Sequence, residues 1–136
     1  TYKLFGLLDA GLGEVNQALG SQLESSYKEL AVDPWKRVEV AYSVPGGGEE
    51  VTWSFMVKDH NVSFSASFCP EAASDGAGSE LQRVDKHEAD DGPVSGSFTP
   101  DAPGILKLVF DNSYSWVKRK HVLYRVEPDS LEAVAR

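Results

Sequence analysis

Cysteine is almost absent from this sequence, which contains Cys69 alone. A single thiol excludes a disulfide within the chain and a tetrahedral metal site built from several thiolates. Because structural disulfides are typical of oxidising compartments, we expect a cytoplasmic protein. Cys69 itself follows an apolar stretch and is expected to act as a small packing residue rather than as a reactive thiol.

Positive charge and long apolar runs are also scarce. The 136 residues include 13 Lys and Arg against 21 Asp and Glu, which gives a formal net charge of −8. A surface that is negative on average repels phosphate groups, so only a local basic patch could favour an anionic bilayer. The apolar runs are far shorter than the roughly 20 residues of a membrane-spanning helix. The sequence therefore predicts no nucleic-acid partner and no transmembrane helix.

Residues that commonly carry catalysis or hold metal ions are few and scattered. His60, His87 and His121 lie in different segments, and the carboxylates that surround one of them, at Asp85, Glu88, Asp90 and Asp91, could attract a cation but are expected to be solvated charges of a loop. No serine lies in a nucleophile-elbow pattern, and the glycines after Pro45 lack the helix and Lys-Ser/Thr pair of a phosphate-binding loop. We therefore expect a protein that is not an enzyme, with no catalytic residue, metal or cofactor.

An amphipathic stripe runs through the N-terminal part of the chain. Apolar residues recur at spacings of three or four, at Leu8, Leu12, Val15, Leu19, Leu23, Tyr27 and Leu30. This spacing predicts an α-helical segment within residues 1–34, ended by Asp33-Pro34 because the residue before proline avoids the helical region. The apolar stripe has three candidate partners, namely the rest of the chain, a second copy, or a neighbouring domain.

From Trp35 onward the apolar period changes from 3.6 to two residues, as half-buried strands require. Alternating or apolar segments bounded by turn residues occur at Val38–Tyr42, Val51–Val57, Val62–Phe68, Val94–Phe98, Ile105–Phe110 and Val122–Val126. Short strands at this spacing predict an all-β fold, an antiparallel, jelly-roll-like β-sandwich over residues 35–128.

Two stretches depart from this rhythm. Residues 70–93 are rich in Ala, Gly, Ser, Asp and Glu, so we expect a long acidic loop with at most one short strand near Leu81–Val84. The tail 129–136 is compatible with a helical turn or a frayed end, and the sequence does not decide between them.

Four blocks occur in an order that resembles a known family. Their key residues are Trp53 and Phe55 in one strand, Phe64 in the next, Pro103, Gly104, Phe110, Asp111 and Asn112 around the strand that follows the Pro-Gly turn, and Tyr124 in the last. Spread over Val38–Val126, they resemble the GOLD (Golgi dynamics) domain. The similarity is strongest to the cytosolic versions attached to Sec14-like lipid-transfer proteins and to Golgi and endosomal adaptors. The resemblance implies a β-sandwich that binds proteins in membrane traffic or lipid transport.

One concentrated basic feature lies near aromatic residues. Lys118, Arg119 and Lys120 follow Tyr114 and Trp116, and Lys36 and Arg37 would extend the patch if the first strand lies nearby. Cations beside aromatic rings suit an anionic membrane surface, since each contributes about 1 kcal/mol near the headgroups. Alternatively, Tyr114 and Trp116 cap the end of the sandwich, and the cations are solvated charges that protect a strand edge.

Three functional hypotheses follow from these observations. The first is a protein-binding module that offers strand edges and loops to a partner in vesicle traffic. The second is a peripheral membrane or phosphoinositide binder that uses the basic and aromatic patch, on Golgi or endosomal membranes. The third is a structural appendage that packs on a neighbouring lipid-transfer or coiled-coil domain. Salt separates the first two, because an electrostatic lipid contact weakens as ionic strength rises.

Overall fold

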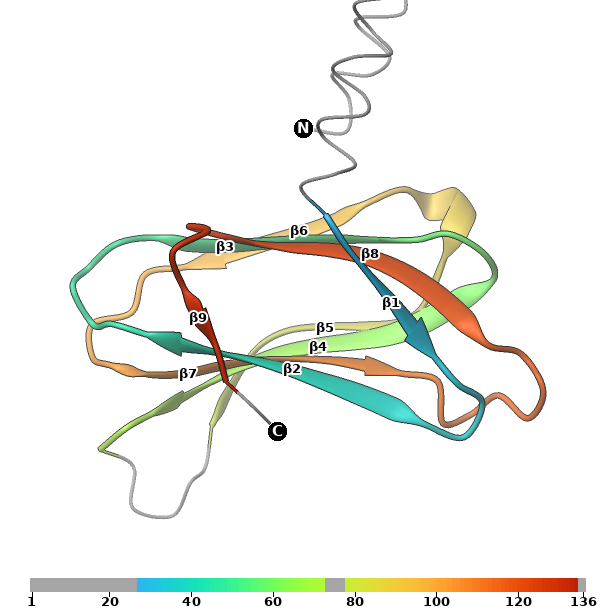
Figure 1. The fold of residues 1–136 in the computed structure, drawn as a ribbon, viewed down its shortest axis with the longest axis horizontal. Helices are drawn as coiled ribbons and strands as arrows, with labels where there is room; N and C mark the ends of the chain where they lie inside the picture. Colours follow the sequence, from blue (N-terminus) through green and yellow to red (C-terminus); the bar gives the residue numbers. More distant parts are fainter. Residues whose placement is uncertain (1–26, 73–77, 135–136) are drawn as a thin grey trace, which may run out of the picture.

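The computed structural model describes residues 27–72 and 78–134, which form two antiparallel β-sheets stacked as a sandwich (Figure 1). The elements are β1 (Lys28–Val32), β2 (Arg37–Val44), β3 (Val51–Val57), β4 (Asn61–Pro70), β5 (Ser79–Glu88), the 3₁₀ turn η1 (Ala89–Asp91), β6 (Val94–Phe98), β7 (Gly104–Asp111), β8 (Lys120–Glu127) and β9 (Glu132–Ala133). One sheet has the order β1-β8-β3-β6 and the other β5-β4-β7-β2-β9. The predicted all-β sandwich is confirmed.

The core lies between the two sheets and follows from the period of two in the strands. In β7, Leu106, Leu108 and Phe110 are buried, whereas the residues between them face outward. Phe110 also meets Phe55 of the opposite sheet and Phe64 of β4, with ring centroids 4.4 to 5.4 Å apart among the three. Each buried phenylalanine contributes about 1.5–3 kcal/mol, so this cluster is a principal link between the sheets.

The six alternating segments of the sequence all became strands, namely β2, β3, β4, β6, β7 and β8. Two of the motif residues that carry the family resemblance, Trp53 and Gly104, have clear structural roles. The indole of Trp53 donates a hydrogen bond to Gln82 Oε1 at 2.7 Å and so ties β3 to β5 across one side of the sandwich. Gly104 is required by a close approach, since a Cβ there would lie 2.4 Å from the backbone oxygen of Cys69.

The helical prediction is wrong at its C-terminal end. Lys28–Val32 forms β1, which pairs with β8 from Lys28 opposite Tyr124 to Val32 opposite Lys120. The position of Leu30 fits the helical spacing with Tyr27 and also a strand alternation with Val32. Pairing with β8 selects the strand, because it buries Val32 and provides hydrogen-bond partners for the backbone N–H and C=O groups. The sandwich therefore begins at Lys28 rather than at residue 35. The rest of the predicted helix, residues 1–26, lies outside the described residues.

The prediction of a loop over residues 70–93 is also wrong for much of its length. Ser79–Glu88 forms β5, which pairs with β4 at the side of the five-stranded sheet. Two register shifts, between Val62 and Phe64 and between Ala66 and Ser67, break the alternation that would have revealed the strand. In the tail, Glu132–Ala133 forms β9 against Tyr42 and Ser43 of β2.

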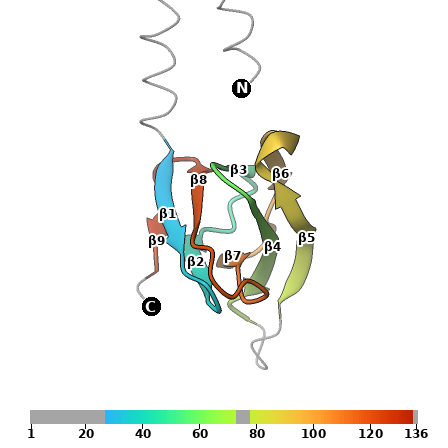
Figure 2. The ribbon, with the colours of Figure 1, turned by 90° about the vertical axis from the view of Figure 1, so that its right-hand side faces the viewer.

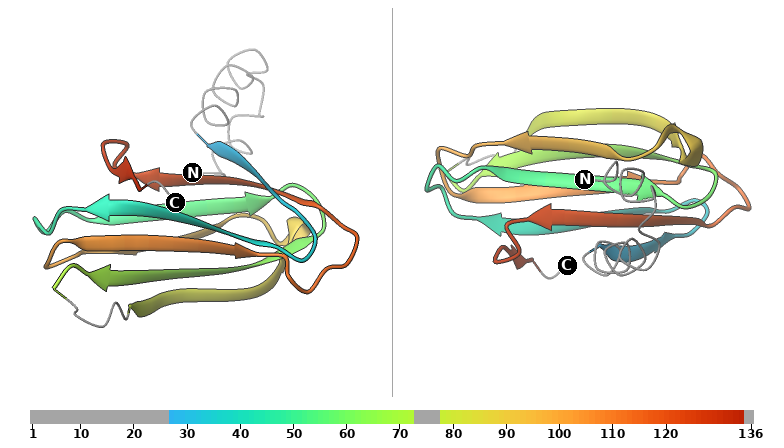
Figure 3. Two further views of the ribbon diagram at one scale, coloured as in Figure 1. Left: turned by 60° about the horizontal axis from the view of Figure 1, so that its bottom comes forward. Right: turned by 90° about the horizontal axis from the view of Figure 1, so that it is seen from above.

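The two ends of the sandwich carry different loops. Figure 2 looks onto the end where β1 passes into β2 and β7 passes into β8. Figure 3 (left) shows β2, β7, β4 and β5 side by side, with the β2–β3 and β6–β7 connections at the opposite end. The connecting loops therefore form two separate surfaces, one at each end of the strands.

Candidate functional site

The loops 33–36 and 112–119 lie against each other at the end shown in Figure 2. Backbone hydrogen bonds join them: Trp35 N donates to Ser115 O at 3.1 Å, and Asn112 N donates to Lys36 O at 2.9 Å. The β1–β2 turn and the β7–β8 connection, about 80 residues apart in sequence, thus form one continuous surface.

Exposed apolar side chains gather on this surface. Among the described residues the large hydrophobic side chains classed as exposed are Trp35, Trp116 and Val117, which are 56%, 71% and 80% exposed. The two indole rings contact each other, with centroids 4.7 Å apart and planes at 46°. We call these three residues the aromatic tip. A contiguous apolar group of this kind marks an interaction surface more often than single exposed residues do.

The backbone at Trp35 has an unusual conformation. Lys36 N donates to Asp33 O at 3.2 Å, Pro34 occupies the second position of this turn, and Trp35 has a φ of +70°. These are features of a type II turn, whose third position normally holds glycine because side chains with a Cβ are strained there. A bulky residue at positive φ costs about 1–3 kcal/mol, and such strain clusters at functional sites. Holding an indole in this position therefore costs stability.

Four exposed cations lie on or directly beside the two loops that carry the aromatic tip. Lys36, Arg37, Lys118 and Arg119 are all exposed, as expected if these loops form one patch. Arg119 Nε lies 2.6 Å from Asp33 Oδ1, so one of the four charges is offset locally. We call these four residues the basic rim. The sequence predicted that Lys36 and Arg37 would join this patch if the first strand lay near Lys118 and Arg119. The structure brings the two segments together through the hydrogen bond from Asn112 N to Lys36 O.

Lys120 does not belong to the basic rim, contrary to the sequence-based prediction. Its side chain points inward as the first of the alternating buried residues of β8 and is 3% exposed. Its ammonium group donates to Asn61 O at 2.9 Å and to Asn112 Oδ1 at 2.8 Å. Burial lowers the pKa of Lys120, although the nearby carboxylates of Asp59 and Glu88 act in the opposite direction.

Asn112 connects the elements beneath the tip. Its fully buried side chain donates to Val32 O at 3.0 Å and to Lys118 O at 2.8 Å, and accepts from Lys120. The neighbouring motif residue Asp111 closes the turn after β7 by accepting from Ser113 N at 2.7 Å, whereas Asn112 links β1, β8 and the intervening loop.

Tyr114 supports the tip from within rather than forming part of it. The ammonium groups of Lys86 and Lys120 lie 4.8 and 5.0 Å from the centroid of its half-buried ring, and its hydroxyl donates to Asn61 Oδ1 at 2.5 Å. Burial raises the pKa of the Tyr114 hydroxyl, with a further contribution from Asp111. Of the two aromatic residues predicted to contact a partner, Trp116 is exposed and Tyr114 is only partly so.

Within residues 27–72 and 78–134, no three His, Cys, Asp or Glu side chains are grouped so that they could hold a metal ion. The same ranges contain no helix with the length and hydropathy needed to cross a bilayer.

No protein-family model matches the chain. The sequence is similar to part of Patellin-6. The match to this Arabidopsis thaliana protein is 31% identical over 97 residues, and covers 71% of this chain and 23% of Patellin-6. The chain thus spans about a quarter of the length of the curated relative it matches. A solved structure, the Yersinia pseudotuberculosis-derived mitogen, aligns with a TM-score of 0.48 and 12% identity over 81% of this chain and 93% of the mitogen.

Sequence reasoning found most of the surface cations but missed the features that organise them. Val117 carries no sequence signal, because its exposure depends on the course of the loop. The strain at Trp35 follows from the Asp33-Pro34 turn and could have been suspected from the proline at its second position. The linking role of Asn112 depends on contacts with β1, which the sequence places in a helix.

Proposed function

We propose that this chain is a peripheral membrane-docking domain that inserts its aromatic tip into the headgroup region of an anionic bilayer. The supporting observation is that the large exposed hydrophobic side chains of the described residues, Trp35, Trp116 and Val117, share one surface with the basic rim. The similarity to Patellin-6, a Sec14-like protein, favours a parent protein of lipid transfer or membrane traffic. The setting implied by the GOLD resemblance is the cytosolic face of a Golgi or endosomal membrane.

The chemistry of the tip suits this role. Indole rings prefer the membrane–water interface, where the ring is partly desolvated and its N–H still finds a partner. Each cation of the basic rim adds about 1 kcal/mol next to anionic lipids, and Asp33 offsets about one of the four. The formal net charge of −8 acts against association in any other orientation, so binding depends on the tip facing the bilayer.

The test is co-sedimentation of the chain with vesicles of phosphatidylcholine alone or with added phosphatidylserine or phosphoinositide. Trp116→Ala and Lys118→Glu should each weaken binding to anionic vesicles, and 0.5 M NaCl should abolish the anionic dependence. Lys28→Glu is the matched control, since it makes the same charge change at the start of β1, away from the tip, and should bind like the parent chain. No binding of the parent chain to any vesicle, or equal loss in the Lys28 control, would contradict the proposal.

Trp35→Gly gives a sharper separation of folding and binding. Glycine accepts a φ of +70° without strain, so this variant should fold with unchanged or higher stability while losing membrane affinity. The free energy of unfolding and the vesicle-bound fraction are measured on the same preparation. Weaker membrane binding that merely tracks a loss of stability would count against a direct contact.

A specific feature also favours a protein-binding role. Within the described residues, β9 pairs with Tyr42 and Ser43 of the eight-residue strand β2 and Val134 adds a hydrogen bond to Ala41, so a partner could add a strand to the rest of this edge of the five-stranded sheet. Such a complex would survive 0.5 M NaCl and the Trp116→Ala substitution, because neither affects backbone pairing at β2. A complex lost under both conditions would instead belong to the tip.

A further inference from the structure

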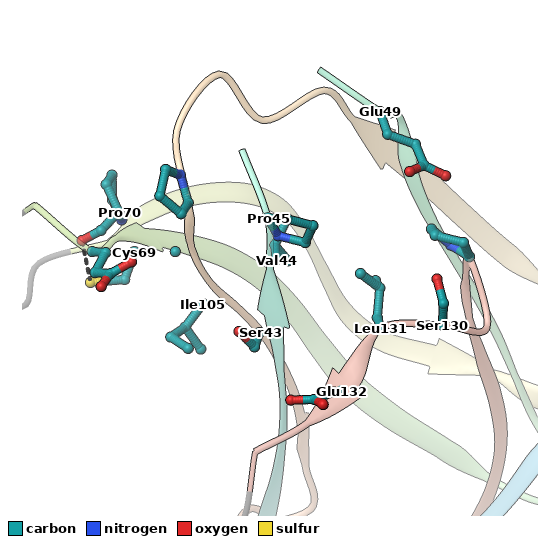
Figure 4. Close-up of a pocket in the computed structure, with 14 residues that line it drawn as sticks. Ser43, Val44, Pro45, Glu49, Cys69, Pro70, Ile105, Ser130, Leu131 and Glu132 are labelled. Atoms are coloured by element: carbon teal, nitrogen blue, oxygen red, sulfur yellow. Dashed lines mark hydrogen bonds between the residues drawn. The ribbon is translucent and has the colours of Figure 1, made fainter. Parts of the chain in front are cut away.

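The end of the sandwich opposite the tip contains an open cavity of about 740 Å³ (Figure 4). Its floor is a row of four neighbouring positions on adjacent strands. Cys69 of β4 pairs with Ile105 of β7, Ile105 with Ser43 of β2, and Ser43 with Glu132 of β9. Adjacent strands lie about 4.8 Å apart, so the row is about 14 Å long.

The walls of the cavity are largely apolar. Pro45, Pro70, Pro103 and Pro128 line it together with Leu131, which Figure 4 shows across the cavity from the Cys69 end. Proline has no backbone N–H, so these four positions offer no hydrogen-bond donor. Among the lining residues that the structure describes, the side-chain donors are the hydroxyls of two serines and the weakly donating thiol of Cys69.

The charged groups in this cavity are all carboxylates. Glu49, Glu71 and Glu132 line it, and no Lys, Arg or His of residues 27–72 and 78–134 does. Among the described residues none of the three forms an ion pair or a hydrogen bond through its side chain. Glu71 lies next to Pro70 at one end of the floor, and Glu132 forms the other end. Within the described part of the chain, the cavity thus combines an apolar middle with carboxylates at both ends that have no paired cation.

We propose that this cavity binds an extended segment of a partner protein in which two apolar residues lie between two basic ones. Four extended residues span about 13 Å, which matches the floor. Because successive side chains of an extended segment point to opposite sides, one apolar residue would pack on Ile105 and the next on Pro45 and Leu131, while the cations at either end reach Glu71 and Glu132. Charge complementarity selects a basic segment, and the apolar middle selects against simple polyamines. This site is independent of the aromatic tip and of membrane binding.

The test uses the ¹⁵N-labelled chain and the blocked hexapeptide GKLVRG. Titration at 0.1 M NaCl should give saturable amide shifts centred on Ser43, Cys69 and Ile105. Glu71→Gln/Glu132→Gln should weaken binding about fivefold to tenfold, as expected for the loss of two solvent-accessible ion pairs. Asp90→Asn/Asp91→Asn is the matched control, since it removes two exposed carboxylates at the opposite end and should change affinity less than about twofold.

Two further peptides and one chemical measurement keep the result interpretable. GKSSRG tests the apolar middle and GELVEG tests the charges, and both should bind at least about fivefold more weakly than GKLVRG. The hexapeptide should also slow alkylation of Cys69, which reports occupancy of the floor in any variant that folds. Absence of saturable shifts, shifts outside the cavity, equal binding of GKSSRG, or equal loss in the Asp90/Asp91 control would each overturn the proposal.

Discussion

Replacing Asn112 by alanine removes the side chain that joins β1, β8 and the loop bearing Trp116. Three hydrogen bonds disappear together, those to Val32 O and Lys118 O and the one from the Lys120 ammonium. The bonds to Val32 and Lys120 are buried, so water cannot replace either of them without opening the structure.

The cost can be assembled group by group. The carbonyl of Val32 loses its buried side-chain donor, and a buried group that loses a hydrogen-bond partner costs about 1–3 kcal/mol. The buried Lys120 ammonium keeps its bond to Asn61 O but loses one of its two acceptors, and an incompletely compensated buried charge is more costly than a neutral group. We therefore expect Asn112→Ala to lower the free energy of unfolding by about 3–5 kcal/mol.

Urea denaturation followed by tryptophan fluorescence measures this difference. Ser113→Ala is the matched control, since this neighbouring side chain is exposed and its removal should change the free energy of unfolding by less than about 0.5 kcal/mol. An Asn112→Ala loss below about 1 kcal/mol, with an unchanged dependence on urea, would refute the view that Asn112 holds the end of the sandwich together.

Further substitutions test separate parts of the structure. Lys120→Glu should destabilise the fold by about 3–5 kcal/mol, because it places an uncompensated charge in a buried position. Lys118→Glu should change the free energy of unfolding by less than about 0.5 kcal/mol and act only on vesicle binding. Equal stabilities of the two variants in urea denaturation would contradict the burial of Lys120. Gly104→Ala should cost about 1–3 kcal/mol because its Cβ would overlap the neighbouring strand, while Gly47→Ala, with no atom within 4 Å, should be neutral by the same assay. Burial raises the pKa of Tyr42 above its ordinary 10.0, so the folded state keeps this proton where the unfolded state loses it, and stability falls as the pH rises above about 10. Tyr42→Phe should show a smaller loss of unfolding free energy between pH 8 and pH 11, and an identical loss would count against this assignment.

The sequence predicted the strands whose inward residues form the core, because burial on one face imposes a strict alternation. β7 illustrates this, since its buried leucines and phenylalanine alternate with residues that face outward. β5 escaped prediction because it lies at the side of its sheet, is mostly exposed, and is paired through two register shifts. β1 escaped because Leu30 fits both periods, and only pairing with β8, about 90 residues later, selects the strand.

The candidate site was predictable in composition but not in geometry. The residue types near Trp116 indicated a basic and aromatic patch, yet the inward direction of Lys120 depends on where β8 begins. Likewise, the proximity of Trp35 to Trp116 follows from the pairing of β1 with β8 and of β2 with β7. The site depends on contacts between segments that are distant in the sequence, and local sequence patterns do not predict such contacts.

The hydrogen bond from Asn112 to the carbonyl of Val32 has a mechanical consequence. Val32 is the last residue of β1, and β1 pairs with β8 on one side only. A load applied at Lys28 and directed away from the sheet would unzip β1 one residue pair at a time, from Tyr124 toward Lys120. The peeling front would then reach a side-chain anchor instead of another ladder bond. Asn112 therefore sets the force at which tension transmitted along the chain would begin to disturb the aromatic tip.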